Sequence, residues 1–145
     1  MVADERALDP FNDGTTRCRV ATQAQIQTTG SSSPAVGAEP GTGVRNQLLC
    51  RELNEQISAL ADRFGMETDL ELVCECASGE CFQRLPLSRA DYESIRRFPT
   101  RFLVKAGHAC NGTERIVAEN QQFVMVEKVG ADAAKVIIFD PRRRR

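Results

Sequence analysis

Apolar residues recur at helical spacing over residues 45–64. Steps of four, four, three and four separate the apolar residues Leu49, Leu53, Ile57, Leu60 and Phe64. Because an α-helix turns once in about 3.6 residues, these side chains share one face, with polar residues between them. Gly65 follows the last of them, as is typical of a helix end. The pattern predicts an amphipathic helix whose apolar face covers the sheet of its own domain.

A second interpretation of this helix is a coiled-coil dimer, in which the apolar face meets a partner helix. A coiled coil is recognised by at least three or four sustained heptads. Residues 45–64 are too few to provide them. We therefore favour the packed helix, and we keep the dimer as the alternative.

The period of the pattern changes to two after residue 69. Glutamates and a valine alternate with Leu70, Leu72 and Cys74. This alternation predicts a β-strand that runs into a turn at Ser78-Gly79. Residues 81–85 lead out of the turn as the paired strand, and we expect Pro86 to end it. The hairpin has the form of a zinc knuckle.

The remaining chain predicts a second short helix and more strands. Ser88 is a typical N-cap, Asp91 is placed to reach back to it, and Pro99 stops the helix. Apolar runs predict four strands, over residues 101–105, 114–118, 123–127 and 136–139. We expect the second and third of these to form a hairpin and the last to lie at an edge. The predicted fold class is α+β, with the first helix packed on a small, mostly antiparallel sheet.

Composition divides the 145 residues into three parts. Residues 1–43 are rich in Ser, Thr, Gly and Pro, which bury too little apolar area to offset an ordering cost of about 1–2 kcal/mol per residue. We predict a disordered tail over 1–43, a single zinc-stabilised domain over 44–140 and a basic tail over 141–145.

The overall charge and the length of the apolar runs exclude some classes of protein. The formal net charge is −1, so the chain has no global basic field for nucleic acid or an anionic membrane. No apolar run approaches the roughly 20 residues that span a bilayer. The first residues are charged and no apolar stretch follows them, which argues against a secretory signal. We expect a cytoplasmic protein.

The densest chemical feature is a group of soft metal ligands. Cys74, Cys76 and Cys81 lie within eight residues, and the only histidine of the chain is His108. On a strand, the first two cysteines point to the same face, and the turn brings the third beside them. His108 or Cys110 then completes a four-ligand site; we favour His108, because three cysteines and one histidine are a standard closed zinc site.

Structural Zn²⁺ is the cofactor that these ligands predict. In a reducing compartment, a dense thiol cluster indicates metal or redox chemistry more often than disulfides. Thiolates and imidazole select zinc over calcium or magnesium, and an iron–sulfur cluster more usually takes four cysteines. A thin core with one tyrosine and no tryptophan would gain much of its stability from such an ion.

Several short motifs in the same order resemble a known group of sequences. These are the Cys-x-Cys-x4-Cys turn at 74–81, the segment 85–96, Pro99 to Phe102, and Gly107-His108. Over about residues 46–128 the chain resembles a group of small uncharacterised actinobacterial proteins. The resemblance implies a shared fold in which Cys74, Cys76, Cys81 and His108 are matching positions. Ser78-Gly79 and the terminal arginines depart from that group.

The sequence favours binding over catalysis. It has no His-Glu-x2-His, Gly-x-Ser-x-Gly or Gly-rich phosphate motif, and Glu75 is expected to point away from the metal face. We therefore predict a non-catalytic, zinc-binding interaction or regulatory module with a protein partner. One alternative is a thiol and zinc redox sensor. Another is a nucleic-acid-binding regulator that uses Arg84, Arg96, Arg97, Arg101 and the arginines at 142–145.

Overall fold

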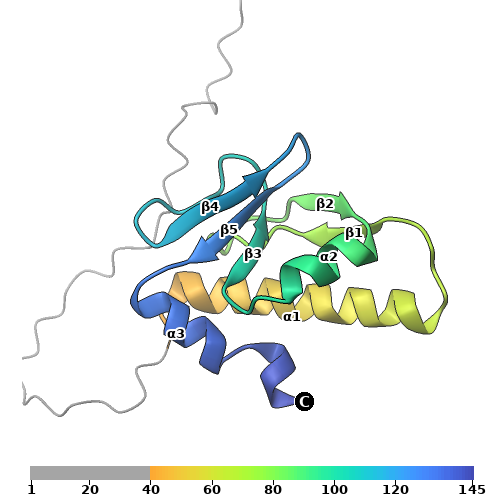
Figure 1. Ribbon diagram of the computed structural model, residues 1–145, viewed down its shortest axis with the longest axis horizontal. Coiled ribbons are helices and arrows are strands. Elements are labelled where there is room, and N and C mark those ends of the chain that lie inside the picture. Colours follow the sequence, from red (N-terminus) through yellow and green to blue (C-terminus); the bar gives the residue numbers. More distant parts are fainter. Residues whose placement is uncertain (1–39) are drawn as a thin grey trace, which may run out of the picture.

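The structure is a computed structural model that describes residues 40–145, and within them it confirms the α+β class (Figure 1). The long helix α1 (Thr42–Arg63) runs along one side of two small antiparallel sheets. One sheet pairs β1 (Leu70–Val73) with β2 (Arg84–Leu87). The other has the strand order β3-β5-β4, with bounds Arg101–Val104, Val124–Lys128 and Glu114–Glu119. The predicted tail of residues 1–43 lies almost wholly outside the described residues.

The first hairpin forms where the period-two pattern predicted it, but β1 ends at Val73 and β2 begins at Arg84, so residues 81–83 of the predicted second strand lie outside it. Leu72 pairs with Leu85 across the strands, and both are buried. Pro86 was expected to end the second strand, but it lies inside β2 opposite Glu71. In a sheet of two strands each strand is an edge, and an edge strand tolerates proline because it has a side with no ladder to disrupt.

The second helix and the second hairpin also follow the prediction. Ser88 caps α2 (Arg89–Arg96), and its hydroxyl accepts from the backbone N–H of Asp91 at 3.1 Å. Tyr92 and Ile95 on this helix are buried. Strands β4 and β5 pair antiparallel, with a register shift between Ile116 and Ala118. Among the helices of residues 40–145, none combines the length and hydrophobicity that a bilayer span requires.

The predicted edge strand at residues 136–139 is wrong, because most of that run belongs to helix α3 (Ala131–Ile138). A short apolar run has no period that distinguishes strand from helix. Gly130 precedes the helix with φ +66°, a left-handed conformation that suits glycine, and alanines fill the first turns. Val136 is the one residue of α3 that is fully buried.

Helix α1, predicted over residues 45–64 and found over Thr42–Arg63, faces the opposite way. The exposed fractions of Leu49, Leu53, Leu60 and Phe64 are 62, 46, 51 and 72 %. The buried face is mostly polar and consists of Val44, Gln47, Arg51, Asn54, Glu55, Ser58 and Ala61. The predicted packing of the apolar stripe on the domain's own sheet is therefore wrong. Polar side chains occupy the buried side because each finds a backbone or charged partner there.

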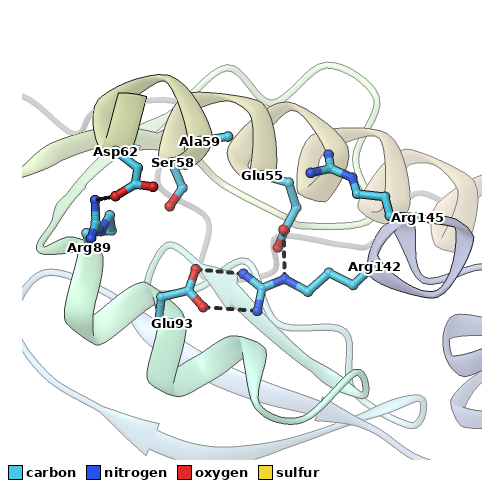
Figure 2. A pocket seen from close by; sticks show the side chains of 8 residues that line it. All are labelled: Glu55, Ser58, Ala59, Asp62, Arg89, Glu93, Arg142 and Arg145. Carbon is cyan, nitrogen blue, oxygen red and sulfur yellow. Dashed lines mark hydrogen bonds and ion pairs between the residues drawn. The ribbon is translucent and has the colours of Figure 1, made fainter. Parts of the chain in front are cut away.

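Residues 141–145, which the composition predicts as a basic tail, are partly folded against the domain. Pro141–Arg144 form a 3-10 helix, η1, in which Pro141 is buried. Figure 2 shows Arg142 reaching between α1 and α2. Its Nε atom lies 2.7 Å from Glu55, and its two Nη atoms lie 3.0 and 2.7 Å from Glu93. Through these ion pairs, Arg142 connects η1 to both α1 and α2.

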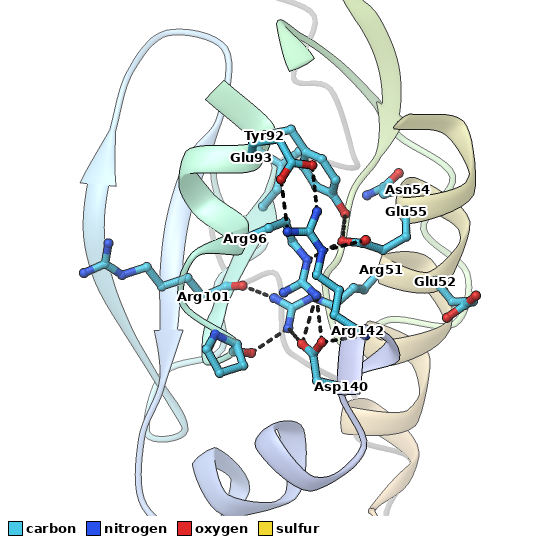
Figure 3. Close-up of polar contacts among 12 residues, drawn as sticks. Arg51, Glu52, Asn54, Glu55, Tyr92, Glu93, Arg96, Arg101, Asp140 and Arg142 are labelled. Carbon is cyan, nitrogen blue, oxygen red and sulfur yellow. Dashed lines mark hydrogen bonds and ion pairs between the residues drawn. The ribbon is translucent and has the colours of Figure 1, made fainter. Parts of the chain in front are cut away.

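A network of buried charges lies between α1, α2 and η1 (Figure 3). Asp140 accepts from both Arg51, at 3.2 Å, and Arg96, at 2.9 Å. Arg96 also donates to Glu55 at 2.5 Å. Because the side chain of Arg96 is fully buried, it is not presented on the surface where the nucleic-acid alternative placed it. The charges of these side chains balance one another away from water.

The stability of this network should depend on pH through Glu55. Burial raises the pKa of Glu55, but hydrogen bonds from Arg142 and Arg96 outweigh burial and hold the pKa below its ordinary value of 4.5. A lowered pKa stabilises the fold above the unfolded-state value, and this contribution is lost as pH falls through the folded-state value.

We therefore expect the melting temperature to fall more steeply below about pH 4.5 in the wild type than in Glu55→Gln, which lacks the titrating group. Thermal unfolding of both proteins across the acid range measures this. Glu80→Gln, at an exposed position, should follow the wild-type curve. Parallel curves for the wild type and Glu55→Gln would contradict the assignment of this pH dependence to Glu55.

Candidate metal centre

Four side chains with metal-binding atoms converge beside the β1–β2 hairpin: Cys74, Cys76, Cys81 and His108. Their ligand atoms all lie within 4.8 Å of one another. Nδ1 of His108 lies 3.4 Å from Sγ of Cys81 and 3.7 Å from Sγ of Cys74. The fold thus brings together all four residues that the sequence proposed as ligands.

Backbone hydrogen bonds position the first cysteine and the histidine. The N–H of Cys74 donates to the carbonyl of Gln83 at 2.9 Å, which continues the hairpin pairing beyond β1. The N–H of His108 donates to the carbonyl of Lys105 at 3.0 Å, which closes a turn after β3. Gly107 has φ +83° in this turn, where a side chain would be strained. The turn directs the histidine toward the thiols.

The polar face of α1 holds the backbone on both sides of Cys74. Asn54 donates to the carbonyl of Val73 at 2.9 Å and accepts from the N–H of Val73 at 2.8 Å. Gln47 donates to the carbonyl of Glu75 at 3.1 Å. These contacts explain why α1 buries amides, because they satisfy backbone groups that the short sheet leaves unpaired.

A buried carboxylate connects the histidine loop to the same helix. Glu114 accepts from the side chain of Gln47 at 2.7 Å and from the backbone N–H of Cys110 at 2.7 Å. Its charge is balanced by Lys128 at 2.8 Å, with both side chains almost fully buried. The segment that carries His108 is therefore tied to α1 independently of any ion.

Crowding changes the acidity of the thiols. A hydrogen bond from Cys74 lowers the pKa of Cys76 to about 5, although burial raises it. The same hydrogen bond and burial raise the pKa of Cys74 far above its usual range, and burial raises the pKa of Cys81. Without a cation, the cluster therefore favours one thiolate beside neutral thiols. A divalent cation would supply the charge that lets the other thiols ionise.

Each of the three sulfurs also has a backbone hydrogen bond. The N–H of Lys105 donates to Sγ of Cys74 at 3.2 Å. Backbone hydrogen bonds from Ser78 and Gln83 lower the pKa values of Cys76 and Cys81, respectively. Such donors favour the thiolate, the form that binds metal. The donor set, its spacing and its hydrogen bonds fit a soft or borderline divalent ion such as Zn²⁺.

The other residues considered from the sequence lie outside this cluster. Glu75 is fully buried on the opposite side of the chain, where its carboxylate accepts from Asn54 at 2.9 Å and from the N–H of Leu103 at 3.2 Å. Glu80 is exposed on the turn. Cys110, the alternative fourth ligand, is not among the four converging residues.

The sequence reasoning missed a neighbouring thiol. Cys50 on α1 is a free, half-buried cysteine outside the cluster. Burial, followed by the negative charges of Glu75, Cys76 and Cys81, raises its pKa to about 11. Nothing in the local pattern around residue 50 indicated its neighbourhood, because that depends on which face of α1 is buried.

No protein-family model matches the chain, and no curated protein or solved structure matches it. The fold and the side chains therefore define the class of protein on their own. It is an α+β protein with a cluster of three cysteines and one histidine that can hold a metal ion. The resemblance to actinobacterial proteins remains a prediction.

Proposed function

We propose that this protein is a zinc-stabilised binding module that acts in regulation and does not catalyse a reaction. The observation that carries the proposal is the convergence of three thiols and one imidazole within 4.8 Å. A closed set of four protein ligands is characteristic of structural zinc, whereas catalytic zinc keeps one position for water or substrate.

The position of the cluster in the fold supports a structural role. Its cysteines flank the turn between β1 and β2, and its histidine comes from the loop between β3 and β4. One ion would thus join the connections of the two sheets at the edge of the core, where Cys74 and Cys76 are buried. Apparent binding free energies of structural zinc reach about 10–16 kcal/mol, and this energy also stabilises the fold.

The surroundings of the cluster support the absence of hydrolytic chemistry. A metal-bound water needs a nearby general base. Glu75 is the acidic residue between two of the cysteines, yet its carboxylate is committed to α1 and β3. We propose a protein partner in preference to nucleic acid, because Arg96 and Arg142 are bound to internal carboxylates. We also propose a cytoplasmic location, because the cysteines of the cluster are free thiols, which a reducing compartment maintains.

Metal analysis tests the proposal directly. We expect purified wild-type protein to contain one zinc per chain, and His108→Ala to contain much less. Cys110→Ala is the matched control and should retain the ion, because Cys110 lies outside the cluster. Replacement by Co²⁺ should give the intense visible absorption of tetrahedral thiolate coordination. A metal-free wild type that also fails to take up added zinc would overturn the proposal.

A further inference from the structure

The face of α1 that is turned away from the domain carries large apolar side chains toward both of its ends. Leu49, Leu53, Leu60 and Phe64 are each exposed by nearly half or more, and Met66 just beyond the helix is 52 % exposed. Between them, Gln56 is exposed and Ile57 packs partly against the core. Monomeric proteins rarely leave so many large apolar side chains on one helix face in water. Within residues 40–145 this is the longest helix, so the stripe is also a long one.

The spacing of these residues is symmetric about the middle of the helix. Leu49 and Phe64 lie equally far from a point between Gln56 and Ile57, and so do Leu53 and Leu60. An antiparallel copy related by a two-fold axis at that point would place Leu49 against Phe64 and Leu53 against Leu60. A two-fold interface requires such self-complementarity, because each patch meets itself.

A groove lies beside Leu49 where the opposing Phe64 would arrive. It has a volume of about 470 Å³, and its lining combines the apolar Leu48, Leu49, Phe139 and Pro141 with the charged Arg45, Glu52, Arg144 and Arg145. An aromatic side chain that enters an apolar pocket is a typical anchor of a protein interface. The groove also widens the contact beyond one helix, which is needed because specific interfaces bury about 1,000 Å² or more in total.

Charges beside the stripe favour the same arrangement. Glu52 borders the groove and lies 3.6 Å from Arg145 of its own chain, and Arg63 precedes Phe64. When the phenylalanine of one copy approaches the groove of the other, Arg63 approaches Glu52 of that copy. A parallel arrangement would instead oppose each residue to its own counterpart, and like charges would repel.

We propose that a second copy of this chain covers the stripe, with two α1 helices packed antiparallel and Phe64 of each copy in the groove of the other. Residues 1–39 are a weaker candidate occupant, because they have one aromatic residue, Phe11, among many Ser, Thr and Gly residues. The proposal is independent of the proposed function, since none of its residues belongs to the metal cluster.

Sedimentation velocity of the full chain over a range of concentrations tests the dimer. We expect a reversible monomer–dimer equilibrium in the wild type and an increase of about 100-fold or more in the dissociation constant for Leu60→Glu. Phe82→Glu is the matched control and should dimerise like the wild type, because Phe82 is also exposed, at 82 %, but lies between β1 and β2 and outside α1. Circular dichroism and zinc content confirm that each variant is folded.

Charge reversal tests the orientation. Glu52→Arg and Arg63→Glu should each weaken the dimer by roughly tenfold, because two ion pairs become repulsive, and the double variant should recover most of this loss. A parallel dimer would show no recovery and would overturn the arrangement. A wild type that stays monomeric at all concentrations would overturn the dimer. The same holds if cross-linking of such a monomer shows that residues 1–39 cover α1.

Discussion

For the proposed zinc site, substitution of Cys81 by serine is expected to remove the metal ion and to unfold most of the domain. Small domains have free energies of unfolding of about 5–15 kcal/mol. A structural zinc ion supplies an amount of the same order, about 10–16 kcal/mol. Cys81 is only half-buried, so the loss cannot be attributed to a polar atom placed in the core. Zinc content and denaturant unfolding of the purified variant measure both effects.

Cys50→Ser provides the control for this experiment. Cys50 has the same intermediate burial as Cys81 and is also a free thiol, but it lies outside the cluster. We expect this variant to keep one zinc per chain and nearly wild-type stability. A strong chelator should unfold both the wild type and Cys50→Ser. If Cys81→Ser retains its zinc and its stability, the cluster is not the metal site.

Replacement of Arg51 by methionine is expected to lower the free energy of unfolding by about 3–5 kcal/mol, the usual cost of removing one partner from buried charges. The side chain of Arg51 is completely buried. It donates to the carbonyl of Pro99 at 2.6 Å and to the carbonyl of Arg101. Its guanidinium lies 3.6 Å from the ring centroid of Phe102. Methionine fills similar volume but leaves these carbonyls without the guanidinium donors and removes one of the two arginines that pair with Asp140. Urea unfolding measures the change.

Arg89→Met is the matched control for Arg51→Met. Arg89 pairs with Asp62, but both side chains are about half exposed or more. Exposed ion pairs contribute about 0–1 kcal/mol, so this variant should unfold almost as the wild type does. Equal effects of the two substitutions would show that the buried network contributes no more than a surface pair.

The periodicity of the sequence predicted the position of α1 but not which of its faces is buried. Apolar spacing normally identifies the buried face, because burial of apolar area drives packing. Here a second stripe, Gln47, Arg51, Asn54 and Ser58, has the same helical spacing on the other side. Its partners are backbone groups of β1 and carboxylates far along the chain, and no local pattern reveals them.

The candidate ligands were predictable because their chemistry is local. Three of them lie within eight residues, all in the connection that the pairing of β1 with β2 closes. The expectation that Cys74 and Cys76 lie on the strand itself is wrong, because β1 ends at Val73. His108 was chosen over Cys110 because Gly107 permits a tight turn toward the thiols and because three cysteines and one histidine are a standard zinc site. The structure places His108 beside the thiols through that turn. The nearness of Cys50 to the thiol cluster could not be predicted, since it depends on which face of α1 packs inward.

The pairing of Arg51 with Asp140 bears on when the core can assemble during protein synthesis. The two residues are separated by 89 positions. A nascent chain therefore carries α1 out of the ribosome long before the aspartate that neutralises its buried arginine has been made. Until then, Arg51 and Arg96 have no shared counter-ion, and their desolvation is unfavourable. We therefore expect the interior of this domain to close only after η1 has left the ribosome.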